Sequence, residues 1–194
     1  MKVLVLKKCT EQRTSNNGKF TYPEKGYVEA PDWNGKPECG GGLHGLLWGH
    51  GTFDLDPYGT LFLVIECDSE NVIEFDSKCK FKCGNVLLTG NQEEAIRLLK
   101  SHPNYPKDNI LNYDVQIDVK FAVAGYWSTL TGGYWSTLTG GNGSTLTGGN
   151  GSIFIVYYWK GGQYIPIVKK ITKSTANKIY KFENGKFNLI HNKP

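Results

Sequence analysis

Short apolar segments separated by polar turns follow one another along most of the chain. Residues 2–8 have the pattern of an opening strand, residues 61–67 (LFLVIEC) form a continuous apolar run, and residues 72–88 hold three more short apolar segments. Segments of this length between polar turns are typical of β-strands. The pattern therefore predicts a mainly β protein.

A single helix interrupts this pattern. Asn91 is a favourable N-cap, and Glu94 stands three residues later, as in a capping box. Pro103 ends the helix because proline cannot continue it. The predicted apolar face consists of Ala95, Ile96, Leu98 and Leu99. We expect this face to pack on a sheet, so residues 1–112 are predicted to form an α+β module.

The strictest alternation of apolar and polar residues lies at residues 114–123 (DVQIDVKFAV). Side chains at every second position of a strand share one face. The sequence therefore predicts a half-buried strand with one apolar face, formed by Val115, Ile117, Val119, Phe121 and Val123.

Two β-hairpins are predicted near the C-terminus. The first joins residues 153–159 to residues 164–171 through a Gly-Gly turn, and the second joins residues 179–182 to residues 187–190 through Asn-Gly. Asn-Gly between alternating segments is a strong hairpin signal. Residues 153–194 are therefore predicted to form an antiparallel meander.

An eight-residue repeat fills residues 125–152, which read GYWSTLTG twice, then GNGSTLTG, then GNGS. The glycine pairs and the β-branched threonines disfavour a helix and suit a strand of about five residues with a glycine corner. Two units would make one coil of sixteen residues. The sequence thus predicts a short β-solenoid over residues 113–152, with the neighbouring strands covering its two ends.

Period-two alternation sorts the side chains of the repeat into an inner and an outer set. The inner set is Ser128, Leu130, Ser136, Leu138, Ser144 and Leu146, and the outer set is Thr129, Thr131, Thr137, Thr139, Thr145 and Thr147. Aromatic pairs at the corners could bury themselves against a second copy of the chain. We therefore expect a homodimer with an interface at Tyr126, Trp127, Thr129, Tyr134, Trp135 and Thr137.

Residues 39–51 (CGGGLHGLLWGHG) are unusually rich in glycine. Glycine lets a backbone approach a ligand closely, and the two histidines could contact it. The candidate ligand-binding residues are Gly40, Gly41, Gly42, His44, Trp48 and His50. In the alternative interpretation the leucines and Trp48 anchor the core and the glycines serve turns. We assign no catalytic residue and expect no cofactor and no metal, although metal binding by Cys79 and Cys83 stays open.

Charge is unevenly distributed along the chain. The whole chain carries a net charge of +4, whereas residues 153–194 hold eight lysines and one acidic residue. A basic end could meet an acidic partner or nucleic acid, or could simply keep strand edges solvated. Five cysteines without a signal peptide favour a reducing cytoplasm, and no apolar run is long enough to cross a membrane.

The repeat resembles those of bacterial ice-nucleation proteins, whose sixteen-residue coils carry a Thr-x-Thr row. This chain has Thr-Leu-Thr at residues 129–131, 137–139 and 145–147, but it has Trp where that family often has a small residue. Ordering ice needs an extended flat array, for which three rows are too few. The resemblance therefore supports a scaffold and not ice binding.

A second resemblance covers nearly the whole chain. GYVEAPDW, CGGGLHGLLWG, the octapeptide repeat and the C-terminal hairpin resemble uncharacterised proteins of phages and prophage-bearing bacteria. That family has no settled activity, so the resemblance implies only an association with mobile elements. The lack of a complete catalytic set, the self-associating repeat and the many aromatic residues lead us to expect a non-enzymatic protein that binds, and could inhibit, a host protein or defence complex in the host cytoplasm. The repeat would then serve as its oligomerisation scaffold.

The segment Gly41-Gly42-Leu43-His44 also resembles a strand of ADP-ribosyltransferases. An active member of that family should carry Arg or His on its first strand and a catalytic Glu on a later one. Residues 3–8 offer neither Arg nor His, and Glu66 and Glu74 are the candidate acids. The alternative function is therefore a nucleotide-binding or transferase-like protein that uses the glycine-rich segment and His44.

Overall fold

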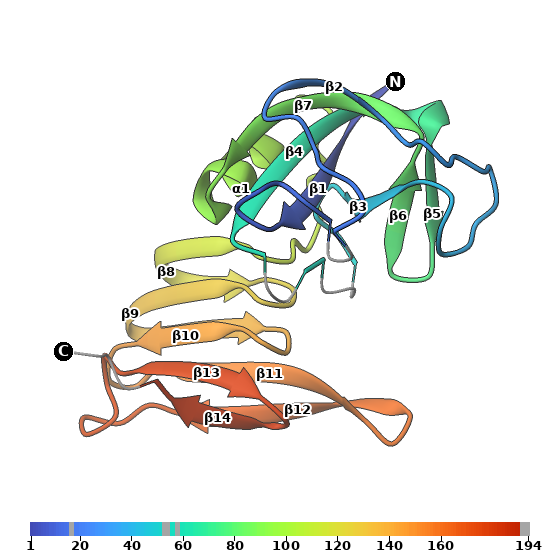
Figure 1. Ribbon diagram of the computed structural model, residues 1–194. Helices are drawn as coiled ribbons and strands as arrows, with labels where there is room; N and C mark the ends of the chain where they lie inside the picture. The colour runs from blue at the N-terminus through green and yellow to red at the C-terminus, as the bar shows by residue number, and fades with distance from the viewer. Residues whose placement is uncertain (16–17, 52–54, 57–58, 191–194) are drawn as a thin grey trace. The chain divides into compact units, whose positions relative to one another are not determined.

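The computed structural model describes residues 1–15, 18–51, 55–56 and 59–190. The chain divides into two compact units, Met1–Asn109 and Ile110–Pro194 (Figure 1). Both units are built from strands, and one α-helix lies in the described part of the chain. The prediction of a mainly β protein is therefore confirmed.

The first unit contains a seven-stranded antiparallel sheet in the order β2-β7-β4-β1-β3-β6-β5. Its strands are β1 (Lys2–Cys9), β2 (Gly26–Glu29), β3 (Leu43–Leu47), β4 (Leu61–Asp68), β5 (Val72–Phe75), β6 (Lys78–Phe81) and β7 (Cys83–Gly90), with a 3-10 turn at Ser69–Asn71. β1 is central, and Val3 to Leu6 are buried. Burial on both faces explains the apolar runs in β1 and β4.

The helix α1 (Gln92–Ser101) agrees with the prediction. The Asn91 side chain accepts a hydrogen bond from the Glu94 backbone, and the Glu94 carboxylate accepts one from the Asn91 backbone. This reciprocal pair satisfies two amides that the first turn would otherwise leave without partners. Ala95, Ile96 and Leu99 are buried, and α1 packs on β4 and β7.

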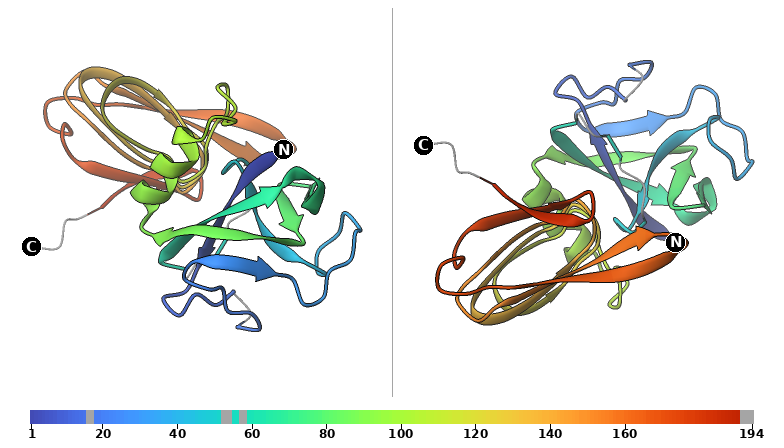
Figure 2. Two further views of the ribbon diagram at one scale, coloured as in Figure 1. Left: turned by 90° about the horizontal axis from the view of Figure 1, so that it is seen from above. Right: turned by 90° about the horizontal axis from the view of Figure 1, so that it is seen from below.

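The second unit contains a curled sheet whose first strands run parallel and whose last strands run antiparallel (Figure 2). Its strands are β8 (Val115–Val123), β9 (Thr129–Gly140), β10 (Thr145–Gly148), β11 (Ile153–Lys160), β12 (Gln163–Lys170), β13 (Ile179–Glu183) and β14 (Lys186–Leu189). Thr129 pairs with Thr145, and Thr137 pairs with Ile153. Both pairs join residues sixteen positions apart.

Serine and leucine form the interior of the repeat, as predicted. Leu130, Leu138 and Leu146 are fully buried together with Phe154. Ser136 Oγ lies 2.9 Å from Ser152 Oγ, sixteen residues along the chain. The buried serine hydroxyls also accept backbone hydrogen bonds from the neighbouring corner. The threonines are half-exposed on the other side of the strands.

The predicted burial of β8 is wrong. Ile117, Phe121 and Val123 are exposed, whereas Ala122 is buried. Phe121 and Val123 pair with the outward threonines of β9, while Ala122 pairs with the inward Leu138. The smallest side chain therefore faces the narrow interior, and the larger ones are left outside. The register of β8 also shifts on both sides of Val119. Val119 therefore packs against the interior while Phe121 and Val123 lie outside, so the predicted apolar face is not kept on one side of the strand.

The two C-terminal hairpins agree with the prediction. β11 pairs with β12, and β13 pairs with β14, both in antiparallel register. Asn184 and Gly185 adopt positive φ angles of 54° and 77°, which a type I′ turn requires. Among the described residues, no helix has the length and apolar character needed to cross a membrane.

Candidate functional site

A cavity of about 470 Å³ in the first unit brings together several titratable side chains of the described chain. Its walls come from β1, β3, the start of β6 and the loops around them. The described lining residues are Lys7, Ser15, Lys19, Phe20, Tyr22, Pro31, Asp32, Gly42, Leu43, His44, Leu55 and Lys78. Three lysines and a histidine thus share the cavity with one carboxylate, that of Asp32.

His44 reaches the cavity from the middle of the sheet. It lies on β3, opposite Lys80 of β6. Its ring makes an edge contact with the ring of Phe75, with ring centres 5.9 Å apart. The buried Nε2 atom has no hydrogen-bond partner among the described residues. Burial, followed by the charges of Lys78 and Lys7, lowers the pKa of His44 to about 4. The imidazole is therefore neutral near pH 7.

Lys7 is buried in the wall of the cavity and is only 5% exposed. Its ammonium lies 5.9 Å from the ring centre of Tyr22, close enough for a cation–π interaction. Burial lowers the pKa of Lys7, and the nearby acidic groups Cys9 and Asp56 partly oppose that shift. Burial likewise raises the pKa of the Tyr22 hydroxyl. The charged form of the Lys7 amine is therefore poorly hydrated in the wall of the cavity.

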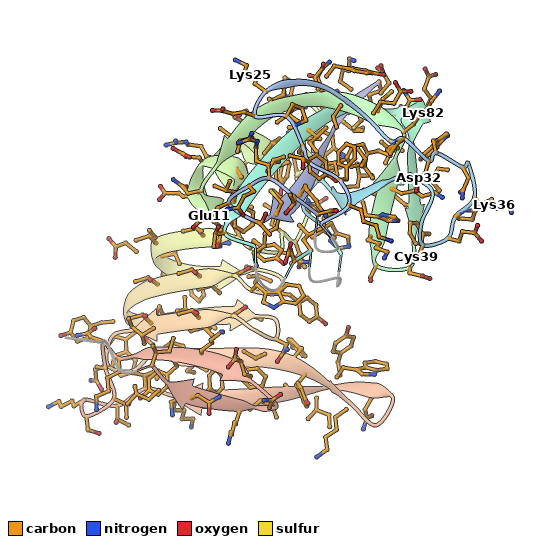
Figure 3. The ribbon with its side chains drawn as sticks, viewed as in Figure 1. Glu11, Lys25, Asp32, Lys36, Cys39 and Lys82 are labelled. Atoms are coloured by element: carbon orange, nitrogen blue, oxygen red, sulfur yellow. The ribbon has the colours of Figure 1, made fainter. Side chains whose placement is uncertain are left out.

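Lys80 holds the glycine-rich loop against the sheet. Its buried ammonium donates hydrogen bonds to Asn34 Oδ1 at 2.7 Å and to the Gly40 carbonyl at 3.3 Å, and it lies 5.4 Å from the Trp33 ring centre. A Cβ atom at Gly41 would lie 2.1 Å from the Asn34 side chain. Figure 3 shows Asp32, Lys36 and Cys39 along this loop, which joins β2 to β3.

The six residues predicted to bind a ligand do not gather at one point. Gly42 and His44 line the cavity, and Gly40 contacts Lys80. Trp48 is buried at the end of β3, where its backbone carbonyl accepts a hydrogen bond from Asn109. His50 lines a separate cavity of about 180 Å³ with Glu74 and Asp76. Gly41 only allows the close approach of Asn34 described above.

Lys7, Lys78 and Tyr22 line the cavity but were not predicted as site residues. Lys7 lies in an apolar strand, and Lys78 is the first residue of β6, which pairs with the strand of His44. A lysine at an inward position of a buried strand is unusual, because lysine is almost never fully buried without a partner. The inward position of Lys7 was the one feature of the sequence that pointed to this site. It did not indicate that Lys7 lies near His44.

The residues predicted to form the dimer interface lie in different environments. Tyr134 and Trp135 are 68% and 66% exposed. Trp127 instead stacks on Tyr113, with ring centres 5.3 Å apart and planes 17° apart. Tyr126 lies with its hydroxyl 3.1 Å from that of Tyr164. Thr129 and Thr137 are half-exposed on the outer side of β9.

The cysteines are all free thiols. Cys79 is buried, and burial raises the pKa of its thiol. Within the described ranges, no three His, Cys, Asp or Glu side chains are grouped so that they could hold a metal ion.

The comparisons with known proteins give no relative on which to model this site. No protein-family model, no curated protein and no solved structure matches the chain.

Proposed function

We propose that the first unit is a non-enzymatic binding domain for a small organic anion. The observation that supports this proposal is the convergence of Lys7, Lys78 and His44 on one cavity. Burial disfavours the charged form of Lys7, and Asp56 offsets only part of that effect. A further negative charge beside Lys7 would therefore lower the free energy of the cavity wall. An anion placed between these side chains would supply that charge and could accept a hydrogen bond from His44 Nε2.

Binding is better supported than catalysis. The two acids suggested by the transferase resemblance lie elsewhere: Glu66 is 3.7 Å from Lys2, and Glu74 lines the smaller cavity. Asp32 is the single carboxylate among the described lining residues, and it is exposed. The described walls therefore hold neither of the two acids that the transferase resemblance suggested.

A nucleotide is the first ligand class to test. The cavity volume of about 470 Å³ falls in the range of small-molecule sites. The rings of Phe20 and Tyr22, with centres 5.0 Å apart, give it an aromatic wall beside the lysines. That combination suits a phosphate attached to a flat, partly apolar group.

Titration calorimetry with ATP, NAD, cyclic nucleotides and inorganic phosphate tests the proposal. We expect at least one nucleotide to bind, and Lys7→Met to weaken it about tenfold or more, as loss of a charge-assisted contact does. Lys25→Met is the matched control, because Lys25 is exposed and does not line the cavity. Equal losses from both variants, or no binding of any anion, would contradict the proposal.

The pH dependence of binding is a second readout. A bound anion favours the charged imidazole and so raises the pKa of His44 from its value of about 4. Binding then takes up a proton, and the affinity should increase as the pH falls from about 7 towards 5. His44→Gln should remove this increase. An affinity that is independent of pH in both proteins would exclude a contact between the anion and His44.

We further propose that residues 113–152 form a short β-solenoid. The sixteen-residue offset of the parallel pairs supports this proposal, because it equals two octapeptide units. The hydrogen bonds between serines sixteen residues apart support it as well. β12 and β13 then close the stack by pairing in the antiparallel sense with β11 and β10.

Engagement of a host protein or complex by this chain, as a phage-type factor, stays a proposal based on resemblance. The observation that favours an acidic partner is the set of exposed lysines at positions 160, 170, 173, 178 and 186. A pull-down from host lysate should then recover a partner that Lys173→Glu/Lys178→Glu loses. Recovery of nucleic acid instead, with strong salt dependence, would favour a phosphate backbone as the partner.

A further inference from the structure

The outer side of the second unit's sheet carries a continuous apolar surface. Directly paired residues lie side by side, and alternate residues of a strand share a face. Read across β8, β9, β11 and β12, the rows are Phe121–Thr137–Ile153–Lys170, Val123–Thr139–Ile155–Val168, Tyr157–Pro166 and Trp159–Tyr164. We call these residues the outer face. It is the opposite side of the sheet from the buried Leu138 and Phe154.

Six large side chains of the outer face are exposed, by between 49% and 73%. They are Phe121, Val123, Tyr157, Trp159, Tyr164 and Val168. An aromatic side chain buries about 150–250 Å² when it is fully covered. Because the four rings are already partly covered, together they offer on the order of 500 Å² of further area. The half-exposed threonines and isoleucines add to this area. The total approaches the roughly 800 Å² that each partner contributes to a stable interface.

The charges of the two hairpin strands lie mostly away from the outer face. Lys170 is its single charged member, at one end of the first row. Lys160 and Lys169 alternate with outer-face residues and therefore project from the other side of β11 and β12. Two such faces can approach each other without opposing their lysines, although this part of the chain is strongly basic.

We propose that a second copy of the chain covers the outer face, so that the protein is a twofold homodimer joined through β8, β9, β11 and β12. A twofold axis sets the same patch against itself, and homodimer interfaces are the more apolar class. The absence of acidic residues from these rows gives no charge pattern for selecting a different protein. This interface lies on the face of the sheet and not at the repeat corners, where Tyr134 and Trp135 lie.

Sedimentation equilibrium of the full chain tests the proposal. We expect the wild type to be a dimer, and Val168→Glu and Thr139→Glu each to weaken self-association about tenfold or more, because both place a charge in the second row. Tyr134→Glu is the matched control, since Tyr134 is at least as exposed but lies at a corner. Far-UV circular dichroism and the urea midpoint establish that each variant is folded, and two independent variants protect the test against one that is not.

Three results would overturn the proposal. The first is a wild type that sediments as a monomer over its whole soluble range. The second is a dimer that both folded outer-face variants leave intact. The third is a dimer that Tyr134→Glu dissociates while Val168→Glu does not, because the corners would then form the interface.

Discussion

Tryptophans of the first two octapeptides pack against glycines sixteen residues later, and this contact explains why the octapeptide changes along the repeat. The Trp127 ring lies over Gly143, and the Trp135 ring lies over Gly151, each sixteen residues along the chain. A Cβ atom would lie 2.4 Å from the first ring and 2.5 Å from the second. A Tyr-Trp corner therefore needs an Asn-Gly corner sixteen residues later, which is the arrangement that the sequence has.

Replacing Gly143 tests this complementarity. Gly143→Ala should lower the free energy of unfolding by about 2–3 kcal/mol, from backbone strain at a φ of 78° and from the clash with Trp127. Gly162→Ala has a similar φ of 84° and open space around it, so it should cost only about 1 kcal/mol. Urea denaturation measures both. Adding Trp127→Ala to Gly143→Ala should recover part of the difference, and additive losses would disprove the contact.

The protonation of His44 links stability to pH. The pKa of this residue is about 4 in the folded chain against an ordinary 6.5, so the unfolded chain binds more protons between these values. The contribution of the neutral ring is complete above pH 6.5 and is lost as the pH falls towards 4. Between about pH 7 and 4.5 the wild type should lose about 1–2 kcal/mol more than His44→Gln, allowing for partial solvent screening. Parallel urea titrations that superimpose would contradict this.

At the scale of the element, the sequence predicted strands and turns better than it predicted which of their faces and residues pack in the core. The capping box of α1 and the Asn-Gly turn of the last hairpin are local signals, and both predictions were correct. The pattern of residues did not predict β3, because the glycines in and before it are typical of a loop, and only the transferase resemblance pointed to a strand near Gly41 and His44. Gly45 is needed there for a tertiary reason, since a Cβ atom would lie 2.3 Å from a methyl group of Val5 and 2.8 Å from the Leu6 carbonyl. Such a contact leaves no local sequence signal.

Substitution of Gly45 should therefore disturb the centre of the first sheet. We expect Gly45→Ala to destabilise the protein by more than about 2 kcal/mol, because the clash involves the backbone of β1 and not only a flexible side chain. Gly35→Ala is the matched control, with no atom within 4 Å and no positive φ, and should be nearly neutral. Thermal unfolding compares the two, and similar melting temperatures would contradict this account of β3.

At the scale of the whole molecule, fold and site were predictable to different degrees. Alternation, turn residues and the octapeptide indicated a mainly β chain and the inner and outer sides of the repeat. The candidate site required positions that are distant in sequence, since Lys7, His44 and Lys78 come from three strands. Only the register of β1, β3 and β6 brings them together, and no pattern within a single segment encodes that register.

The size of the structural repeat predicts which insertions the second unit tolerates. Adding the sixteen residues TLTGGNGSTLTGGNGS after Ser144 should leave a folded protein, because each new strand meets an identical neighbour in register. Adding only the first eight residues should unfold the second unit. A leucine would then pair with Leu138, where Phe154 now pairs, and Phe154 would move to the other side of the sheet's curl, away from its closing strand. Circular dichroism and limited proteolysis distinguish the two. Equal resistance of both proteins would rule out a sixteen-residue period.

The hydrogen bonds of the corner serines have a consequence for how the length of the repeat can change. The backbone N–H of Ser128 donates to Ser144 Oγ, and that of Ser136 donates to Ser152 Oγ in the same way. An added pair of octads could therefore repeat the same bond. Two of the octads are identical in amino-acid sequence. Pairs of octads could therefore be gained or lost while the closing hairpins keep an unchanged surface on which to pack. Variants in nature should differ here by even numbers of octads.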